Sequence, residues 1–177
     1  IDVEKSKVLT EMTIIVEGDK ILSVEKGYST IPEGAEGIDL KSKTVMPGLF
    51  DMHVHIESET SKDNYIKQFT LNEADIAFKS TFYARKTLMA GFTSVRDLGG
   101  TGVNSSLRDA INNGYVEGPT IYSAGKAIAT TGGHADPTNG YKADLMGNPG
   151  PAEGVVNSPE EARKAVRQRY KNGADVI

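Results

Sequence analysis

The chain has 177 residues, of which 38% are hydrophobic and 25% are charged, a composition typical of globular rather than disordered or collagenous proteins. It contains no cysteine, which excludes disulfides, thiolate metal sites and thiol nucleophiles and leaves nitrogen and oxygen atoms as metal ligands. The net charge of -4, without a basic surface or an apolar run of about 20 residues, predicts neither a nucleic acid nor a membrane partner and favours a cytoplasmic location.

The first 44 residues predict part of a small β-domain. Residues 12–16 and 21–24 are rich in β-branched apolar side chains and flank Glu-Gly-Asp-Lys at 17–20, which predicts a hairpin. Ile-Asp-Leu at 38–40 predicts another short strand. A segment of this size buries too little surface to fold by itself, so residues 1–44 need a neighbouring part of the protein.

From residue 45 onward, strand and helix patterns alternate, which is typical of βα units around a parallel sheet. The expected strands are 49–56, 92–97, 120–124 and a fourth beginning at 174. The expected helices cover about 73–90, the region of 107–113, and a segment beginning after Ser158, where an N-cap serine, Pro159 and Glu161 mark a helix start. Residues 125–157 form a long loop rich in Gly and Pro, and loops of that length usually carry function.

The number of βα units bears on completeness. Four units do not close a (β/α)8 barrel, which needs about 250 residues. The fourth predicted strand coincides with the last residues, so we expect these 177 residues to be the first part of a longer protein. The alternative is a natural short protein with a doubly wound sheet of four strands.

The residues with the most specific chemistry lie on the strand predicted at 49–56. Side chains alternate along a strand, so Asp51, His53 and His55 face the same side and the two imidazoles converge. Neutral imidazole is a favoured zinc ligand, and we identify His53 and His55 as candidate metal ligands. The alternatives are two surface histidines or a hydrogen-bonded structural pair. Asp51 either supports the imidazoles by a hydrogen bond or has a purely structural role.

His134 is the third candidate site residue. It follows two glycines in the long loop, on the side of the sheet where barrel enzymes have their active sites. It is either a solvated loop residue or a residue that contacts substrate, and residues 130–136 would then shape the pocket around it.

Several segments together resemble a known family. Residues 45–55, Val-Met-Pro-Gly-Leu-Phe-Asp-Met-His-Val-His, resemble the first-strand signature of the amidohydrolase superfamily. Residues 91–100, the Gly-Pro turn at 118–119 and Thr-Thr-Gly-Gly-His-Ala-Asp at 130–136 are similar to its prolidase-like and imidazolonepropionase-like branch. The resemblance implies an α/β fold in which residues 45–177 form the first half of a (β/α)8 TIM-type barrel. It implies that residues 1–44 form the N-terminal part of a flanking β-sandwich domain.

The same resemblance implies an active site. Two zinc ions would be held by His53 and His55 together with ligands outside this sequence, among them a carboxylated lysine expected directly after Ile177. An aspartate on a later strand would transfer the proton, so no catalytic group lies within this chain. His134 would bind substrate and polarise its carbonyl.

The implied function is that of a metal-dependent amidohydrolase, a dipeptidase of the Xaa-Pro (prolidase) type. In the family mechanism a hydroxide bridging the metals attacks the peptide carbonyl. Hydrolysis of imidazolone-type cyclic amides or of organophosphate esters is the alternative within the superfamily. A metal-free, non-catalytic barrel scaffold is the alternative from another class, and the retained histidine pair argues against it. The expected partners are a small-molecule or dipeptide substrate and further copies of the chain in a homo-oligomer.

Overall fold

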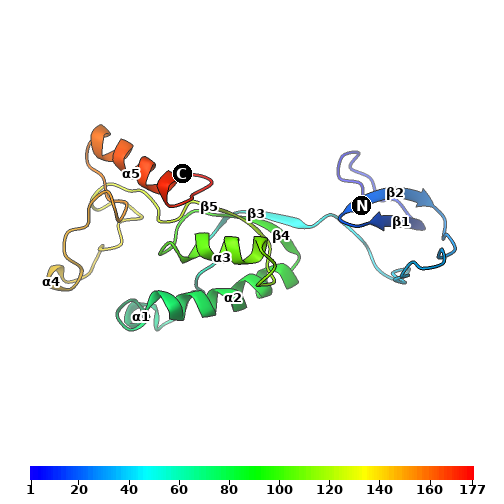
Figure 1. Ribbon diagram of the computed structural model, residues 1–177, viewed down its shortest axis with the longest axis horizontal. Helices are drawn as coiled ribbons and strands as arrows, with labels where there is room; N and C mark the ends of the chain where they lie inside the picture. The colour runs from blue at the N-terminus through cyan, green and yellow to red at the C-terminus, as the bar shows by residue number, and fades with distance from the viewer. The chain divides into compact units, whose positions relative to one another are not determined.

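The computed structural model describes residues 1–177. The chain divides into two compact units, Ile1–Pro47 and Gly48–Ile177, each with its own sheet (Figure 1). None of the helices combines the length and the hydropathy that crossing a membrane requires.

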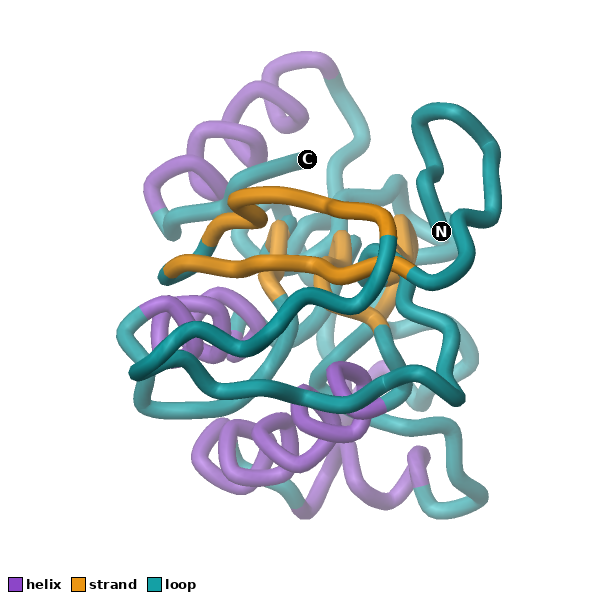
Figure 2. Tube along the Cα trace, turned by 90° about the vertical axis from the view of Figure 1, so that its right-hand side faces the viewer, coloured by secondary structure: helices purple, strands orange, loops and turns teal.

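The first unit contains the predicted hairpin. Strands β1 (Met12–Glu17) and β2 (Lys20–Lys26) pair antiparallel, with an irregularity between Ile15 and Val16, and appear as two orange strands in Figure 2. The strand predicted at 38–40 is wrong, because Ile38 and Leu40 lie exposed in an irregular segment. A strand needs a neighbour for its backbone hydrogen bonds, and no other part of this unit pairs with residues 38–40. The β-sandwich stays a prediction.

The second unit contains the predicted parallel sheet. Its strands β3 (Leu49–Val54), β4 (Phe92–Asp97) and β5 (Thr120–Ser123) lie in that order and all run parallel. Helix α2 (Glu73–Met89) connects β3 to β4, and α3 (Val103–Asn112) connects β4 to β5. The two helices lie side by side along the sheet (Figure 1). This confirms an α/β fold built from βα units.

The apolar core of this unit lies between the sheet and these two helices. It is formed by one buried side chain from each neighbouring segment: Ile56, Ala84, Val95, Leu107 and Ile121. Helices α2 and α3 therefore contribute Ala84 and Leu107 to the core, whereas Phe78 of α2 is exposed. The carboxyl ends of all three strands are left at one edge, where the connecting loops begin.

Helix starts follow the capping signals of the sequence. Helix α5 (Pro159–Lys171) begins as predicted, with the Ser158 hydroxyl accepting a hydrogen bond from the Glu161 backbone N–H at 3.2 Å. Helix α2 begins with a capping box between Asn72 and Asp75. Two short helices, α1 (Asn64–Thr70) and α4 (Ala143–Met146), are not predicted from the sequence. Helix α4 interrupts the long loop, which is otherwise irregular as expected.

Two strand ends differ from the prediction. The first strand ends at Val54 instead of 56, because the backbone N–H of Ile56 donates to the Asp97 carboxylate at 2.8 Å and not to a neighbouring strand. The strand predicted from residue 174 is not formed. There the backbone N–H groups of Asp175 and Val176 share a single acceptor, the Ser123 carbonyl, at 2.7 and 3.4 Å, which does not make a ladder.

Candidate functional site

All three histidines of the chain line one cavity of about 510 Å³. His53 lies in β3, His55 directly follows that strand, and His134 belongs to the loop after β5. Leu98 and Ala124, which directly follow β4 and β5, also line the cavity. The cavity therefore lies at the carboxyl edge of the parallel sheet. The structure brings the three sequence-predicted site residues together there, and their roles stay predictions.

The two histidines from the first strand of the sheet form a close pair. Their ring centroids lie 5.4 Å apart, with the planes inclined by 70°. The Nδ1 atom of His55 lies 2.6 Å from the carbonyl oxygen of Gly99. Because a carbonyl can only accept, Nδ1 carries the hydrogen, and the lone pair on Nε2 is free to bind a metal ion. His55 is thus already in the tautomer that a metal ligand needs.

The residues present fit part of a zinc site. Two imidazoles converge, and nitrogen ligands of this kind suit zinc. No group of three or more His, Asp or Glu side chains in the chain is arranged to hold an ion. A tetrahedral site would need ligands beyond His53 and His55.

Of the two roles predicted for Asp51, support of an imidazole or a structural role, the hydrogen bonds favour the structural one. Its carboxylate accepts a hydrogen bond from the backbone N–H of His53 at 3.0 Å, whereas the ring of His55 is held by the Gly99 carbonyl. Asp51 therefore shapes the backbone of β3 and forms no hydrogen bond with an imidazole.

A buried carboxylate that the sequence did not single out supports His55. Asp97, at the end of β4, is fully buried. Its Oδ1 accepts from the backbone N–H of Gly99 at 3.1 Å and from the Asn104 amide at 2.9 Å, and its Oδ2 accepts from Ile56 N–H. Asp97 therefore fixes both the turn containing Gly99 and the backbone directly after His55. The sequence indicates only that Arg96 and Asp97 face opposite sides of a strand, so that one of the two faces inward.

A second buried carboxylate holds the start of helix α3. Glu57 accepts hydrogen bonds from the backbone N–H groups of Thr101 and Asn104, both at 2.7 Å. These N–H groups lie at a helix start, where a negative charge is favoured and free donors need acceptors. A Cβ at Gly100 would collide with the Glu57 carboxylate in its observed position, so a larger residue there would displace the carboxylate from these donors.

The loop segment with His134 is organised by Asp136. The Asp136 carboxylate accepts from the backbone N–H groups of Gly132 and Thr138, both at 2.9 Å, and from the Thr138 hydroxyl at 2.7 Å. His134 lies between these donors in sequence, so its backbone is enclosed in a hydrogen-bonded turn. The hydroxyl of Thr138, followed by the backbone N–H groups of Gly132 and Thr138, lowers the pKa of Asp136 below its usual value of 3.8.

We expect this turn to be stable to acid until the pH falls below the usual aspartate value. Because the pKa of Asp136 is lowered in the folded protein, its stabilising contribution is present above 3.8 and is lost as the pH falls through the lower folded-state value. Amide NMR shifts of Gly132 and Thr138 should titrate below 3.8. In Asp136→Asn they should not titrate in this range. Titration of the wild-type amides at or above 3.8 would contradict this account.

The fold and the cavity together define an α/β protein with its candidate site at the carboxyl edge of a parallel sheet, where α/β enzymes bind their ligands. Comparison with known proteins then gives the family. Residues 44–177 match the Amidohydrolase family, and the chain belongs to it. This confirms the resemblance carried by residues 45–55.

The chain is similar to prolidase-like members of this family and to other hydrolases. It is 47% identical to a Xaa-Pro dipeptidase whose crystal structure has methionine bound in the active site, with a TM-score of 0.84 over 93% of this chain and 40% of that one. A prolidase crystallised with N-methylphosphonate-L-proline is 33% identical, with a TM-score of 0.79 over 98% and 42%. Ochratoxinase from Aspergillus niger is 32% identical over 92% and 37%. The chain thus spans about two-fifths of the length of these relatives.

Proposed function

We propose that the chain supplies metal ligands and a substrate-contacting loop to a metal-dependent amidohydrolase that cleaves Xaa-Pro dipeptides. The observation that carries the proposal is the convergence of His53, His55 and His134 on one cavity at the carboxyl edge of the sheet. The likeness to a Xaa-Pro dipeptidase and to a prolidase supports the choice of substrate.

The residues of the chain have separate proposed roles. His53 and His55 hold zinc, which when bound polarises a carbonyl and lowers the pKa of a bound water. The Gly99 carbonyl orients the His55 ring. His134 hydrogen-bonds the carbonyl or carboxylate of the dipeptide and so orients the scissile bond. Leu98 and Ile128 provide apolar lining, which limits the water around the bound substrate.

The proposal extends to the whole protein. It comprises a completed (β/α)8 barrel with a β-sandwich, a second zinc ion that a carboxylated lysine would help to hold, and a cytoplasmic homo-oligomer. The likeness to ochratoxinase favours a second candidate, hydrolysis of a substrate that is not a dipeptide. Imidazolone-type amides and organophosphate esters are the other substrates to be compared with Xaa-Pro dipeptides.

The test is a substrate panel with the full-length protein and defined metal content. We expect the zinc-loaded protein to hydrolyse Xaa-Pro dipeptides, to lose the activity on chelation and to regain it when zinc is returned. Pro-Xaa dipeptides of the same composition serve as controls and should be poor substrates. Hydrolysis of non-dipeptide amides or esters alone would favour the second candidate, and a zinc-free protein without hydrolytic activity would refute both.

A further inference from the structure

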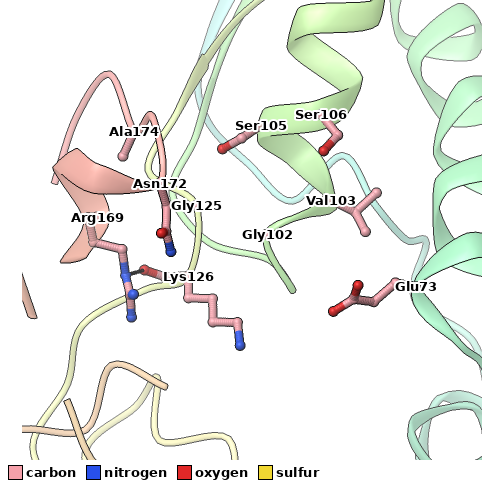
Figure 3. A pocket seen from close by; sticks show the side chains of 10 residues that line it. All are labelled: Glu73, Gly102, Val103, Ser105, Ser106, Gly125, Lys126, Arg169, Asn172 and Ala174. Atoms are coloured by element: carbon pink, nitrogen blue, oxygen red, sulfur yellow. Dashed lines mark hydrogen bonds between the residues drawn. The ribbon is translucent and has the colours of Figure 1, made fainter. Parts of the chain in front are cut away.

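A buried arginine on helix α5 contacts both arms of the long loop. Arg169 is 1% exposed. Its Nε donates to the carbonyl of Lys126 at 2.6 Å and its Nη1 donates to the carbonyl of Ala152 at 3.2 Å. The first of these bonds is the dashed line in Figure 3. Lys126 lies on the outgoing arm of the loop and Ala152 on the returning arm, so one guanidinium joins the two.

The two arms also contact each other directly, at what we call the loop base, residues 126–129 and 152–156. The N–H of Ala129 donates to the Gly154 carbonyl and the N–H of Val156 donates to the Ala129 carbonyl, both at 2.8 Å. Gly154 has a φ of +103°, and a Cβ there would collide with the carbonyl oxygen of Ala127. The loop base therefore joins the two arms by hydrogen bonds and leaves no room for a Cβ at Gly154.

Hydrogen bonds continue from the loop base to His134. The backbone N–H of Thr131 donates to the side-chain oxygen of Asn157 at 3.2 Å, and the side-chain amide of Asn157 donates to the hydroxyl of Thr131 at 2.8 Å. The N–H of Gly133 donates to the Thr130 carbonyl at 2.8 Å, and the Asp136 turn follows. Arg169 and His134 also line the same cavity. A series of hydrogen bonds therefore connects the segment around His134 to the loop base.

The guanidinium of Arg169 is not paired in the way that would stabilise the folded protein most. Its Nη2 is buried without a hydrogen-bond partner, and Arg169 forms no ion pair with a carboxylate, whereas Arg108 pairs with Asp109 and Asp175 at 2.8 and 2.7 Å. Burial lowers the pKa of Arg169, and attraction to Glu153 opposes this only in part. A buried, unpaired charge costs stability that an apolar side chain would not.

We propose that Arg169 is a positioning residue: by bonding both arms of the loop base, it fixes His134 at the cavity that His53 and His55 also line. The consequence for substrate rests on the proposed function, whereas the consequence for the loop does not. Arg169 and Lys126 also line a second cavity of about 360 Å³, with the first turn of α3 on its other side (Figure 3). Both residues therefore line this cavity and also the cavity that contains the three histidines.

The test uses the full-length protein with Arg169→Lys, which keeps the charge but lacks the planar fork that reaches two carbonyls. We expect amide hydrogen exchange at Ala129 and Val156 to become about tenfold faster or more. We expect KM for a Xaa-Pro dipeptide to rise about tenfold, with zinc content unchanged. Arg108→Lys is the matched control, a largely buried arginine away from the cavity, and should change neither readout.

A double-mutant cycle separates positioning from general stability. Once His134 is replaced by alanine, Arg169→Lys should raise KM by less than about twofold further. The imidazole whose position Arg169 would fix is then already absent. Additive effects of the two substitutions, or unchanged exchange at Ala129, would overturn the proposal. If Arg169→Lys does not fold, Asn157→Ala removes the exposed hydrogen bonds to Thr131 that connect the loop base to His134, and it should also raise KM. If no dipeptide is hydrolysed, the proposed function fails, and exchange at Ala129 still decides whether Arg169 holds the loop.

Discussion

Replacing His55 by alanine is expected to remove zinc from the full-length protein and to lower kcat/KM for Xaa-Pro dipeptides by about a thousandfold or more. A metal ion contributes several kcal/mol to transition-state stabilisation, and each factor of ten corresponds to about 1.4 kcal/mol. His55 is the better defined of the two proposed ligands, because the Gly99 carbonyl fixes its tautomer. Elemental analysis of the purified variant and steady-state kinetics measure the two effects.

His134→Ala is the matched control for this substitution. It removes an imidazole from the same cavity but from the loop instead of the strand, so zinc content should remain at the wild-type value while KM rises. The two variants therefore separate metal binding from substrate contact. A His55→Ala protein with wild-type zinc content and unchanged behaviour would instead favour the non-catalytic scaffold.

Sequence patterns predicted the structural features that depend on residues close together in the chain. Alternation placed β4 at its observed bounds of Phe92–Asp97, and the serine, proline and glutamate at 158–161 marked the start of α5. The His-x-His spacing likewise placed two imidazoles on one side of a strand, and they form a close pair. In each case the interaction spans a few residues, and the signal is contained in the local sequence.

Features that depend on distant partners were not predictable in this way. The segment at 38–40 has strand-forming residues but no neighbour to pair with, and residues 174–177 meet only the Ser123 carbonyl. The contacts of Asp97 and Arg169 join residues that are 41 and 43 positions apart. Nothing in the sequence around either residue indicates which distant backbone group it will meet.

Asp97→Ala is expected to produce the largest loss of stability among the substitutions considered. It leaves the N–H groups of Ile56 and Gly99 without acceptors in a buried region. The Asn104 amide loses one of its two acceptors but retains the Gly125 carbonyl. A buried donor left unsatisfied costs about 1–3 kcal/mol, so we expect the free energy of unfolding to fall by about 3–5 kcal/mol. Urea denaturation followed by circular dichroism measures it.

Asp109→Asn provides the control for loss of a carboxylate. The Asp109 side chain is 61% exposed and pairs with Arg108, so its replacement should cost less than about 1 kcal/mol. Asp97→Asn should lie between the two, because an amide keeps one acceptor oxygen but presents N–H donors to a backbone donor. Equal stabilities for Asp97→Ala and Asp109→Asn would show that the buried network contributes nothing.

The same substitution should also weaken zinc binding, although Asp97 is not a proposed ligand. Asp97 holds the N–H of Gly99, and the carbonyl of Gly99 holds Nδ1 of His55, so loss of the carboxylate frees the ring to rotate. Loss of a group that orients a metal ligand typically costs about 10- to 100-fold in metal affinity. Competition with a zinc chelator on folded Asp97→Asn measures this apart from unfolding. Wild-type zinc affinity in that variant would mean that the backbone around Gly99 keeps its place without Asp97.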